Sequence, residues 1–217
     1  MQPWNTGDPD RDWAGYFIPG IDDVLRNRVG ATSAAELSAA ENDLSEARQL
    51  ELWEKPGLAA MRSYDLAHLS TIHAQLFQDV YDWAGQVRTV GIEKDGESFC
   101  PPGNISQAME HVAMRVAETD RLRNVAESVL PQQVAYLYDY VNYAHPFREG
   151  NGRSTREFFN QLLAERSCGL NWELTTSAEL YQACHSARAD SDPSGLEEMF
   201  ERIIDDHPAY EFDVSEH

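Results

Sequence analysis

The sequence predicts an all-α domain that carries one β-hairpin. Apolar residues recur at helical spacing along most of the chain, and the segment 65–83 is the clearest case, because its large apolar side chains form one stripe. The pattern changes over 86–92, which is rich in β-branched residues and is followed by Asp95-Gly96. Asp-Gly favours a hairpin turn because both residues tolerate positive φ. Since a lone short hairpin is not stable in water, we expect it to lie on the helical body.

The remaining elements follow in chain order. Residues 1–20 are rich in Gly, Pro and Asp, so we expect an irregular N-terminal arm there. One domain is expected over 21–204, with the hairpin at about 86–100, and an acidic tail over 205–217. Besides 65–83, helices are expected at 31–50, at 105–122, at 132–144 behind Pro131, and at 153–166 with Gly169 as its C-terminal cap, and one or two more follow.

The composition narrows the class of protein. A chain of 217 residues is long enough for one ordinary domain and too short to suggest two. The net charge is −20 and there are only two lysines, which argues against direct nucleic-acid binding, because neutralising phosphates needs clustered cations. The three cysteines lack metal-ligand spacing, which indicates reduced thiols. No apolar stretch reaches membrane-spanning length and no secretory signal pattern opens the chain, so we expect a cytoplasmic protein without a membrane partner.

Residues 145–156 have the pattern of an anion-binding site. They read His-Pro-Phe-Arg-Glu-Gly-Asn-Gly-Arg-Ser-Thr-Arg. A helix is expected to end at His145, the Gly-Asn-Gly run 150–152 forms a tight loop, and a new helix begins with Arg153. Such a loop directs backbone N–H groups into one concavity at a helix N-terminus, where the helix dipole also favours negative charge. Glycine and asparagine suit it, because both accept left-handed conformations.

The side chains around this loop suit phosphoryl-type transfer. Arg153 and Arg156 are three residues apart, so they share a helix face and can each hold a phosphate. Glu149 is an oxygen ligand of the kind that Mg²⁺ prefers. His145, with an ordinary pKa near 6.5, can accept a proton from an attacking hydroxyl. Phe147 is expected to anchor the loop in the core. Together these residues suit in-line displacement at phosphorus.

Each feature also has an ordinary structural explanation when it is taken alone: a helix cap, a solvated arginine pair, a turn. Their combination in this order is what carries the functional interpretation. A metal-hydrolase site is not supported, because His68 and His73 diverge on one helix and the remaining candidates, His111, His185 and His207, lack spacing partners. A P-loop nucleotidase is excluded, because the sequence has no Gly-x-x-x-x-Gly-Lys-Ser/Thr run.

The order of residues 145–156 resembles the signature of the Fic (filamentation induced by cAMP) family, His-Pro-Phe-x-Asp/Glu-Gly-Asn-Gly-Arg-x-x-Arg. The stretch 81–90 resembles the run that leads into the flap hairpin of that family, and the stretches 16–20 and 25–28 resemble the N-terminus of bacterial Fic toxins. The similarity covers about residues 15–200. It implies a Fic fold, a helical bundle with one β-hairpin flap. It also implies a protein adenylyltransferase, which transfers AMP from ATP to a hydroxyl side chain of a target protein.

The resemblance also implies a role for each matching residue. His145 would deprotonate the target hydroxyl, and Glu149 would hold Mg²⁺ against the α- and β-phosphates of ATP. The residues that would bind the phosphates are Gly150, Asn151, Gly152, Arg153 and Arg156. The flap would align the target segment by strand-like pairing, with Ile92 as a target clamp and with Ser98 and Phe99 near the nucleotide.

The sequence says less about the nucleotide donor and the partner proteins than about the site residues. Related Doc kinases carry a lysine at the position of Gly152, so this glycine favours AMP transfer over phosphoryl transfer. Transfer of UMP, removal of AMP, and a non-catalytic protein-binding module are the alternatives. The family's inhibitory pattern Ser/Thr-x-x-x-Glu-Gly/Asn is missing, because leucine ends both candidate stretches, 32–37 and 175–180. We therefore hypothesise a separate small antitoxin that places a glutamate against Arg156. By resemblance to such toxins, the ATPase subunit of a type II DNA topoisomerase is a candidate target.

Overall fold

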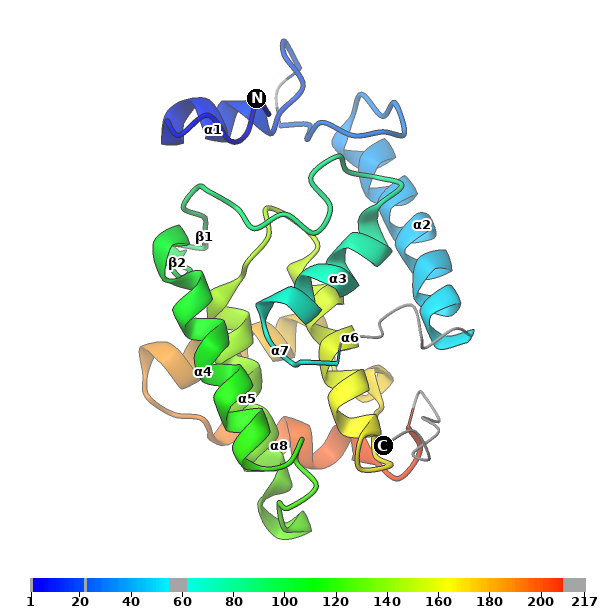
Figure 1. Cartoon of the computed structure of the whole chain (residues 1–217), viewed down its shortest axis with the longest axis vertical. Helices are drawn as coiled ribbons and strands as arrows, with labels where there is room; N and C mark the ends of the chain where they lie inside the picture. The colour runs from blue at the N-terminus through cyan, green and yellow to red at the C-terminus, as the bar shows by residue number, and fades with distance from the viewer. Residues whose placement is uncertain (1, 22, 55–61, 209–217) are drawn as a thin grey trace.

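The computed structural model describes residues 2–21, 23–54 and 62–208, and these form a mostly helical bundle (Figure 1). The expected all-α fold class is confirmed. In the described ranges no helix has both the length and the apolar character that crossing a bilayer requires. The helices have the bounds α1 Pro9–Gly15, α2 Ala34–Glu54, α3 Leu66–Phe77, α4 Ile105–Glu118, α5 Leu130–Ala144, α6 Asn151–Ala164, α7 Ser177–Ala189 and α8 Ser194–Ile203.

Helix α6 lies at the centre of the bundle. It is buried on nearly all sides, and Phe158, Phe159, Leu162 and Leu163 have no exposed surface. Burial of each such side chain stabilises the fold by about 1.5–3 kcal/mol. Helices α3 and α5 pack against α6, α2 lies beside α3, and α4 and α8 pack on α5 (Figure 1). Because the glycine-rich loop leads directly into α6, this packing fixes the loop against the core.

The predicted hairpin is present and short. Strand β1 (Glu93–Lys94) pairs antiparallel with β2 (Glu97–Ser98), and the turn residues Asp95 and Gly96 have φ values of 52° and 82°. The β-branched segment before β1 is not a strand. Its Arg88 donates a backbone hydrogen bond to the carbonyl of Pro146 at 2.9 Å, so this segment pairs with the motif loop.

The expectation of an irregular arm over 1–20 was wrong for residues 9–15, which form α1. Pro9 stands in the first turn, where its missing N–H is no loss. The side chain of Asp8 accepts hydrogen bonds from the N–H groups of Asp10 and Arg11 at 3.1 and 3.2 Å, which caps the helix. A helix this short shows too little periodicity to be recognised in the sequence.

Several helix ends differ from the expectation. Helix α2 spans 34–54 rather than 31–50, α4 ends at Glu118 rather than at 122, and α6 begins at Asn151 rather than at Arg153, so two residues of the expected loop 150–152 are helical. The stripe over 65–83 is helical only to Phe77, because the N–H groups of Val80 and Tyr81 both turn back to the Phe77 carbonyl at 3.0 Å. Gly169 does not cap α6. It lies in β3 (Gly169–Leu170), which pairs with β4 (Ile204–Asp205), and a Cβ there would lie 1.9 Å from the His207 carbonyl oxygen. The expected acidic tail therefore begins with a strand residue, and its part at 209–217 lies outside the described residues.

Candidate active site

The motif loop begins where α5 ends, at His145. The backbone of His145 is left-handed, with φ 41° and ψ 60°, which is uncommon for a residue with a Cβ. Its N–H donates to the Val141 carbonyl at 3.1 Å, and its carbonyl accepts from Nε of the buried Arg88 at 2.8 Å. The Arg88 guanidinium also donates to the carbonyls of Val90 and Cys100, at 2.7 and 2.6 Å. One buried cation therefore joins the motif loop to both ends of the flap.

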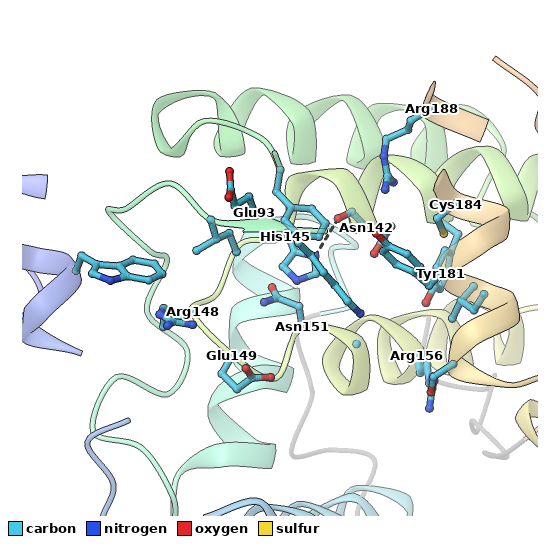
Figure 2. A pocket seen from close by; sticks show the side chains of 18 residues that line it. Glu93, Asn142, His145, Arg148, Glu149, Asn151, Arg156, Tyr181, Cys184 and Arg188 are labelled. Atoms are coloured by element: carbon cyan, nitrogen blue, oxygen red, sulfur yellow. Dashed lines mark hydrogen bonds between the residues drawn. The ribbon is translucent and has the colours of Figure 1, made fainter. Parts of the chain in front are cut away.

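The imidazole of His145 is held in one tautomer by a hydrogen bond to the Asn142 carbonyl (Figure 2). Its Nδ1 lies 3.1 Å from the carbonyl oxygen of Asn142. Because a carbonyl only accepts, Nδ1 carries the hydrogen and Nε2 keeps its lone pair. The ring of Phe99 stacks on the imidazole at a centroid distance of 3.8 Å. Burial lowers the pKa of His145 to about 4, so the ring is neutral at neutral pH and Nε2 can accept a proton.

The loop after His145 is shaped by glycine and asparagine. Gly150 has a φ of 81°, and a Cβ there would lie 2.5 Å from the ring of Phe77. The buried side chain of Asn151 accepts from the Phe147 N–H at 2.9 Å and donates to the Phe147 carbonyl at 2.8 Å. Asn151 thus braces the loop with its side chain and also lines the pocket. Gly152 is exposed, and the N–H groups of the first turn of α6 give a site for an anion.

Arg156 lies in the same pocket as His145 (Figure 2). Its guanidinium bonds the Ser177 hydroxyl at 3.3 Å and lies 5.5 Å from the ring centre of Trp172. In the described part of the chain no carboxylate pairs with Arg156. This guanidinium is therefore positioned to meet a negatively charged group in the pocket.

Arg153 takes a different direction. It forms an ion pair with Glu41 of α2 and donates to the Ser45 hydroxyl at 3.0 Å. Both motif arginines border a hollow of about 350 Å³ between α2 and the segment 170–173. Only Arg156 also lines the pocket that contains His145. The carboxylate of Glu41 thus holds Arg153 beside the pocket.

Glu149 is exposed at the edge of the pocket, and one of its carboxylate oxygens accepts from the Gly150 N–H at 3.0 Å. Its backbone is fixed by His73 of α3. The Nδ1 of His73 accepts from the Gly85 N–H at 2.7 Å, so its Nε2 carries the hydrogen and donates to the Glu149 carbonyl at 2.9 Å. The His73 ring also lies 3.9 Å from that of Phe147, which is fully buried. Sequence reasoning weighed His73 only as a metal ligand, although a polar residue on a buried stripe must find hydrogen-bond partners.

These groups meet in a pocket of about 550 Å³ between the motif loop, the flap and α7 (Figure 2). Of the predicted flap residues, Ile92 and Phe99 line this pocket, and Ser98 lines a neighbouring groove. Helix α7, to which the sequence assigned no role, contributes lining side chains, namely Leu180, Tyr181, Cys184 and Arg188. Their spacing is that of any amphipathic helix, so no signal in the sequence distinguishes them from core residues.

The flap is fastened to the bundle by charged side chains. Glu97 of β2 accepts from Nε of Arg188 at 2.8 Å and lies 2.9 Å from Nδ1 of His185, both on α7. Arg188 also bonds Asp139 of α5 at 2.9 Å. The hydrogen bond from Arg188 holds the pKa of the Glu97 carboxyl below its usual range, so this carboxylate is ionised at neutral pH. The hairpin therefore gains a fixed position that its two short strands do not provide.

Comparison with known proteins identifies the family. Residues 63–163 match the model of the Fic/DOC family. A probable protein adenylyltransferase Fic of Salmonella typhimurium is 31% identical over 189 residues, which is 87% of this chain and 91% of that protein. The protein adenylyltransferase VbhT of Bartonella schoenbuchensis is 33% identical over 160 residues, which is 74% of this chain and 33% of VbhT. Among solved structures, BepC of Bartonella tribocorum with bound AMPPNP has the same fold, with a TM-score of 0.78 at 22% identity and coverage of 89% and 96% of the two chains. The chain therefore belongs to the Fic/DOC family and, like its curated relatives, is a nucleotidyltransferase.

Proposed function

We propose that this enzyme transfers AMP from ATP to a hydroxyl side chain of another protein, in the cytoplasm, with His145 as the base. The observation that carries the proposal is the neutral imidazole of His145, whose Nε2 is unprotonated, in one pocket with the first turn of α6 and Arg156. Nε2 accepts the proton of the target hydroxyl while the hydroxyl oxygen bonds the α-phosphorus. The bond from this phosphorus to the oxygen that bridges to the β-phosphate breaks, and pyrophosphate leaves.

The pocket suits the polyphosphate of ATP. The N–H groups and dipole of the first turn of α6 favour negative charge, and Arg156 adds a guanidinium. The structural relative BepC contains AMPPNP, an ATP analogue, which supports a nucleotide in this fold. In this proposal Gly150, Asn151 and Gly152 hold the phosphates through their backbone. Arg153 joins them once it leaves Glu41.

Glu149 fits a role as the protein ligand of Mg²⁺. Its carboxylate is exposed at the pocket edge beside the first turn of α6. The described residues hold no group of three or more histidine, cysteine or acidic side chains that could bind a metal. Mg²⁺ is commonly held by one or two carboxylates together with substrate phosphates and water. When bound, the ion would offset the negative charge that develops on the phosphates.

The flap is proposed to receive the target. The outer edge of β1 has no other strand beside it among the described residues, so an extended segment can add to it by main-chain hydrogen bonds. Ile92, just before β1, and Phe99, just after β2, both line the pocket, and Phe99 lies against His145. Ile92 would clamp the target segment, and Phe99, with Ser98 beside it, would lie near the nucleotide.

A glutamate supplied by a small antitoxin is the proposed means of inhibition. The two glutamates that came nearest to the inhibitory pattern are engaged elsewhere: Glu36 accepts from the N–H groups of Thr32 and Ser33, and Glu179 pairs with Arg202. Arg156 thus has no inhibitory partner in the described part of the chain. Mixing the purified protein with the product of a neighbouring small reading frame tests this. Neither a complex nor a loss of transfer would contradict it.

The transfer reaction is tested with ATP labelled at the α- or the γ-phosphate, Mg²⁺ and a bacterial lysate. We expect label on protein from α-labelled ATP only, and none with His145→Ala. His111→Ala is the matched control, because His111 lies on α4 away from the pocket and should leave transfer unchanged. Label from the γ-phosphate would instead establish phosphoryl transfer, and label from UTP would establish UMP transfer. No label from any donor would favour a binding module. The purified ATPase subunit of a type II DNA topoisomerase is the first candidate target to add.

A further inference from the structure

A second hollow adjoins the pocket on its flap side. This groove has a volume of about 720 Å³ and runs along residues 91–93. Its walls are mostly apolar and come from α1, the flap and the turn after it, namely Trp13, Ile92, Phe99, Pro101 and Pro102. The groove shares Trp13, Ile92, Glu93 and Phe99 with the pocket, and Phe99 stacks on His145. The groove and the proposed base therefore belong to one continuous surface.

Trp13 is held in place although 42% of its surface is exposed. The guanidinium of Arg148, in the motif loop, lies 4.5 Å from its ring centre. The neighbouring Asp12 is buried and accepts from the hydroxyls of Thr6 and Thr89 at 2.6 and 3.0 Å, which ties α1 to the start of the flap. An aromatic ring that is fixed in advance and still exposed loses little freedom on binding, and such residues are typical of contact surfaces.

The groove lies where an extended partner would place a side chain. If a target segment adds to the free edge of β1, alternate side chains face the same way, and residues two apart are separated by roughly 7 Å. A hydroxyl directed at His145 would then have a neighbour two positions away that faces the groove. Among the described residues that line the groove, Glu93 alone carries a charge, so an acidic side chain is disfavoured there and an apolar one is favoured.

We propose that Trp13, Ile92, Phe99, Pro101 and Pro102 form a target-reading subsite. It receives an apolar side chain two residues from the acceptor hydroxyl in an extended segment of the target protein. This inference rests on the proposed transfer to a protein hydroxyl and adds which sequences around the hydroxyl are accepted. It also assigns a specificity role to α1, a segment that the sequence indicated only as an arm.

Short synthetic peptides with one central hydroxyl residue test the subsite. The residue two positions to either side is leucine, glycine or aspartate, and AMP transfer from α-labelled ATP is measured. We expect the leucine peptides to have a KM about tenfold below that of the aspartate peptides. Trp13→Ala should reduce this preference to less than about twofold by raising the KM for the leucine peptides. Trp13→Phe should restore most of the preference.

Tyr136→Ala is the matched control, because this aromatic residue on α5 is 40% exposed and lies outside both hollows, so the full preference should remain. An equal preference in wild type and Trp13→Ala, or none in the wild type, would overturn the proposal. The proposal would also be overturned if folded proteins were labelled and no peptide was. A dimer that dissociates on Trp13→Ala would mean that a second copy of this chain covers the groove. If the lysate experiment gives no label, the proposed function itself has failed; label on lysate protein without peptide preference refutes the subsite alone.

Discussion

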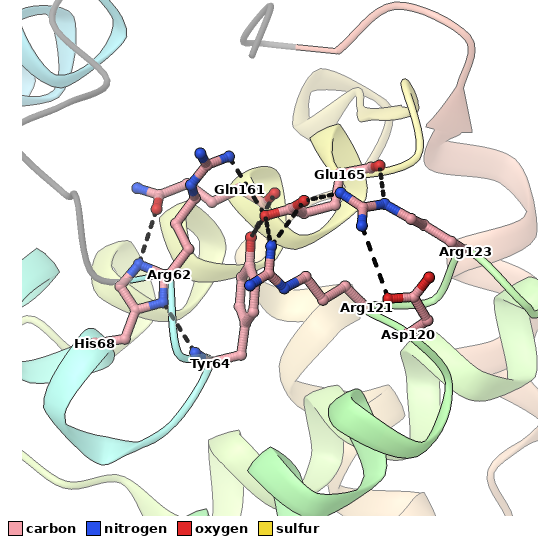
Figure 3. A network of polar contacts seen from close by, with 8 residues as sticks. All are labelled: Arg62, Tyr64, His68, Asp120, Arg121, Arg123, Gln161 and Glu165. Carbon is pink, nitrogen blue, oxygen red and sulfur yellow. Dashed lines mark hydrogen bonds and ion pairs between the residues drawn. The ribbon is translucent and has the colours of Figure 1, made fainter. Parts of the chain in front are cut away.

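Acid should weaken this fold through a buried histidine that has no part in catalysis. His68 of α3 is fully buried. Its Nδ1 accepts from the Tyr64 N–H at 3.3 Å, so Nε2 carries the hydrogen and donates to Gln161 Oε1 at 2.9 Å (Figure 3). If Nδ1 were protonated, its N–H would point at the N–H of Tyr64, and the hydrogen bond between them would be lost. Burial lowers the pKa of His68 to about 4, so the folded state resists a charge that the unfolded chain accepts readily.

The loss of stability in acid follows from the pKa values of His68 in the folded and the unfolded protein. The folded pKa lies below the unfolded value of about 6.5, so the stability from neutral His68 is complete above pH 6.5 and is lost as the pH falls toward 4. Between pH 7 and pH 5 the loss is about 2 kcal/mol. Glu157 has the opposite effect on the pH dependence of stability. Burial raises its pKa to about 7, so the stability that comes from the protonated carboxyl is lost as the pH rises. The wild-type pH profile alone therefore does not isolate His68.

A comparison of the wild type with a His68 variant isolates the contribution of His68. The free energy of unfolding is measured by urea titration at pH 7 and pH 5 for the wild type and for His68→Gln. The glutamine amide can still donate to Gln161. Any loss of stability caused by the substitution itself is the same at pH 7 and pH 5, so it cancels when the two pH values are compared. We expect the change between pH 7 and pH 5 to differ between the two proteins by about 2 kcal/mol. A difference below about 0.5 kcal/mol, which is within the error of such extrapolations, would refute the reasoning.

Three further predictions concern the site. Because the pKa of His145 is lowered to about 4, kcat should stay constant from about pH 6 to 8 and fall only as the pH approaches 4; half-maximal kcat near pH 6.5 would contradict this. Gly150→Ala should destabilise the protein by about 2 kcal/mol or more in urea titration, because a Cβ meets the Phe77 ring at 2.5 Å and φ is 81°. Glu41→Gln should lower the KM for ATP roughly threefold by releasing Arg153; an unchanged or higher KM would mean that the ion pair holds Arg153 in its working position.

Much of the fold was predictable because it depends on local patterns. The apolar stripe over 65–83, the Asp95-Gly96 turn and Pro131 each fix an element by short-range physics, and the elements lie where these signals predict them. Boundaries were less predictable, since the end of α3 and the glycine in β3 depend on contacts with distant parts of the chain. The run 150–152 was predicted only in part: Gly150 turns with a positive φ against Phe77, whereas Asn151 and Gly152 already belong to the first turn of α6.

The site was predictable where one segment carries it and not where several segments meet. His145, Glu149 and Arg156 come from one stretch, and the structure brings them to one pocket. The direction of Arg153 depends on Glu41, more than a hundred residues earlier in the chain, and no local pattern reveals that partner. The lining side chains of α7 and Trp13 likewise take their place only through packing.

Because Arg188 of α7 binds Glu97 of the flap, α7 has two structural roles. One side of this helix lines the cavity proposed for the nucleotide, and the same helix carries the flap that is proposed to meet the target. In the proposed reaction, a substitution on α7 that moves Arg188 would change both the cavity and the position of the flap. If the flap meets the target as proposed, donor and acceptor preferences would be coupled, and selection for a new nucleotide would change the range of accepted proteins as well.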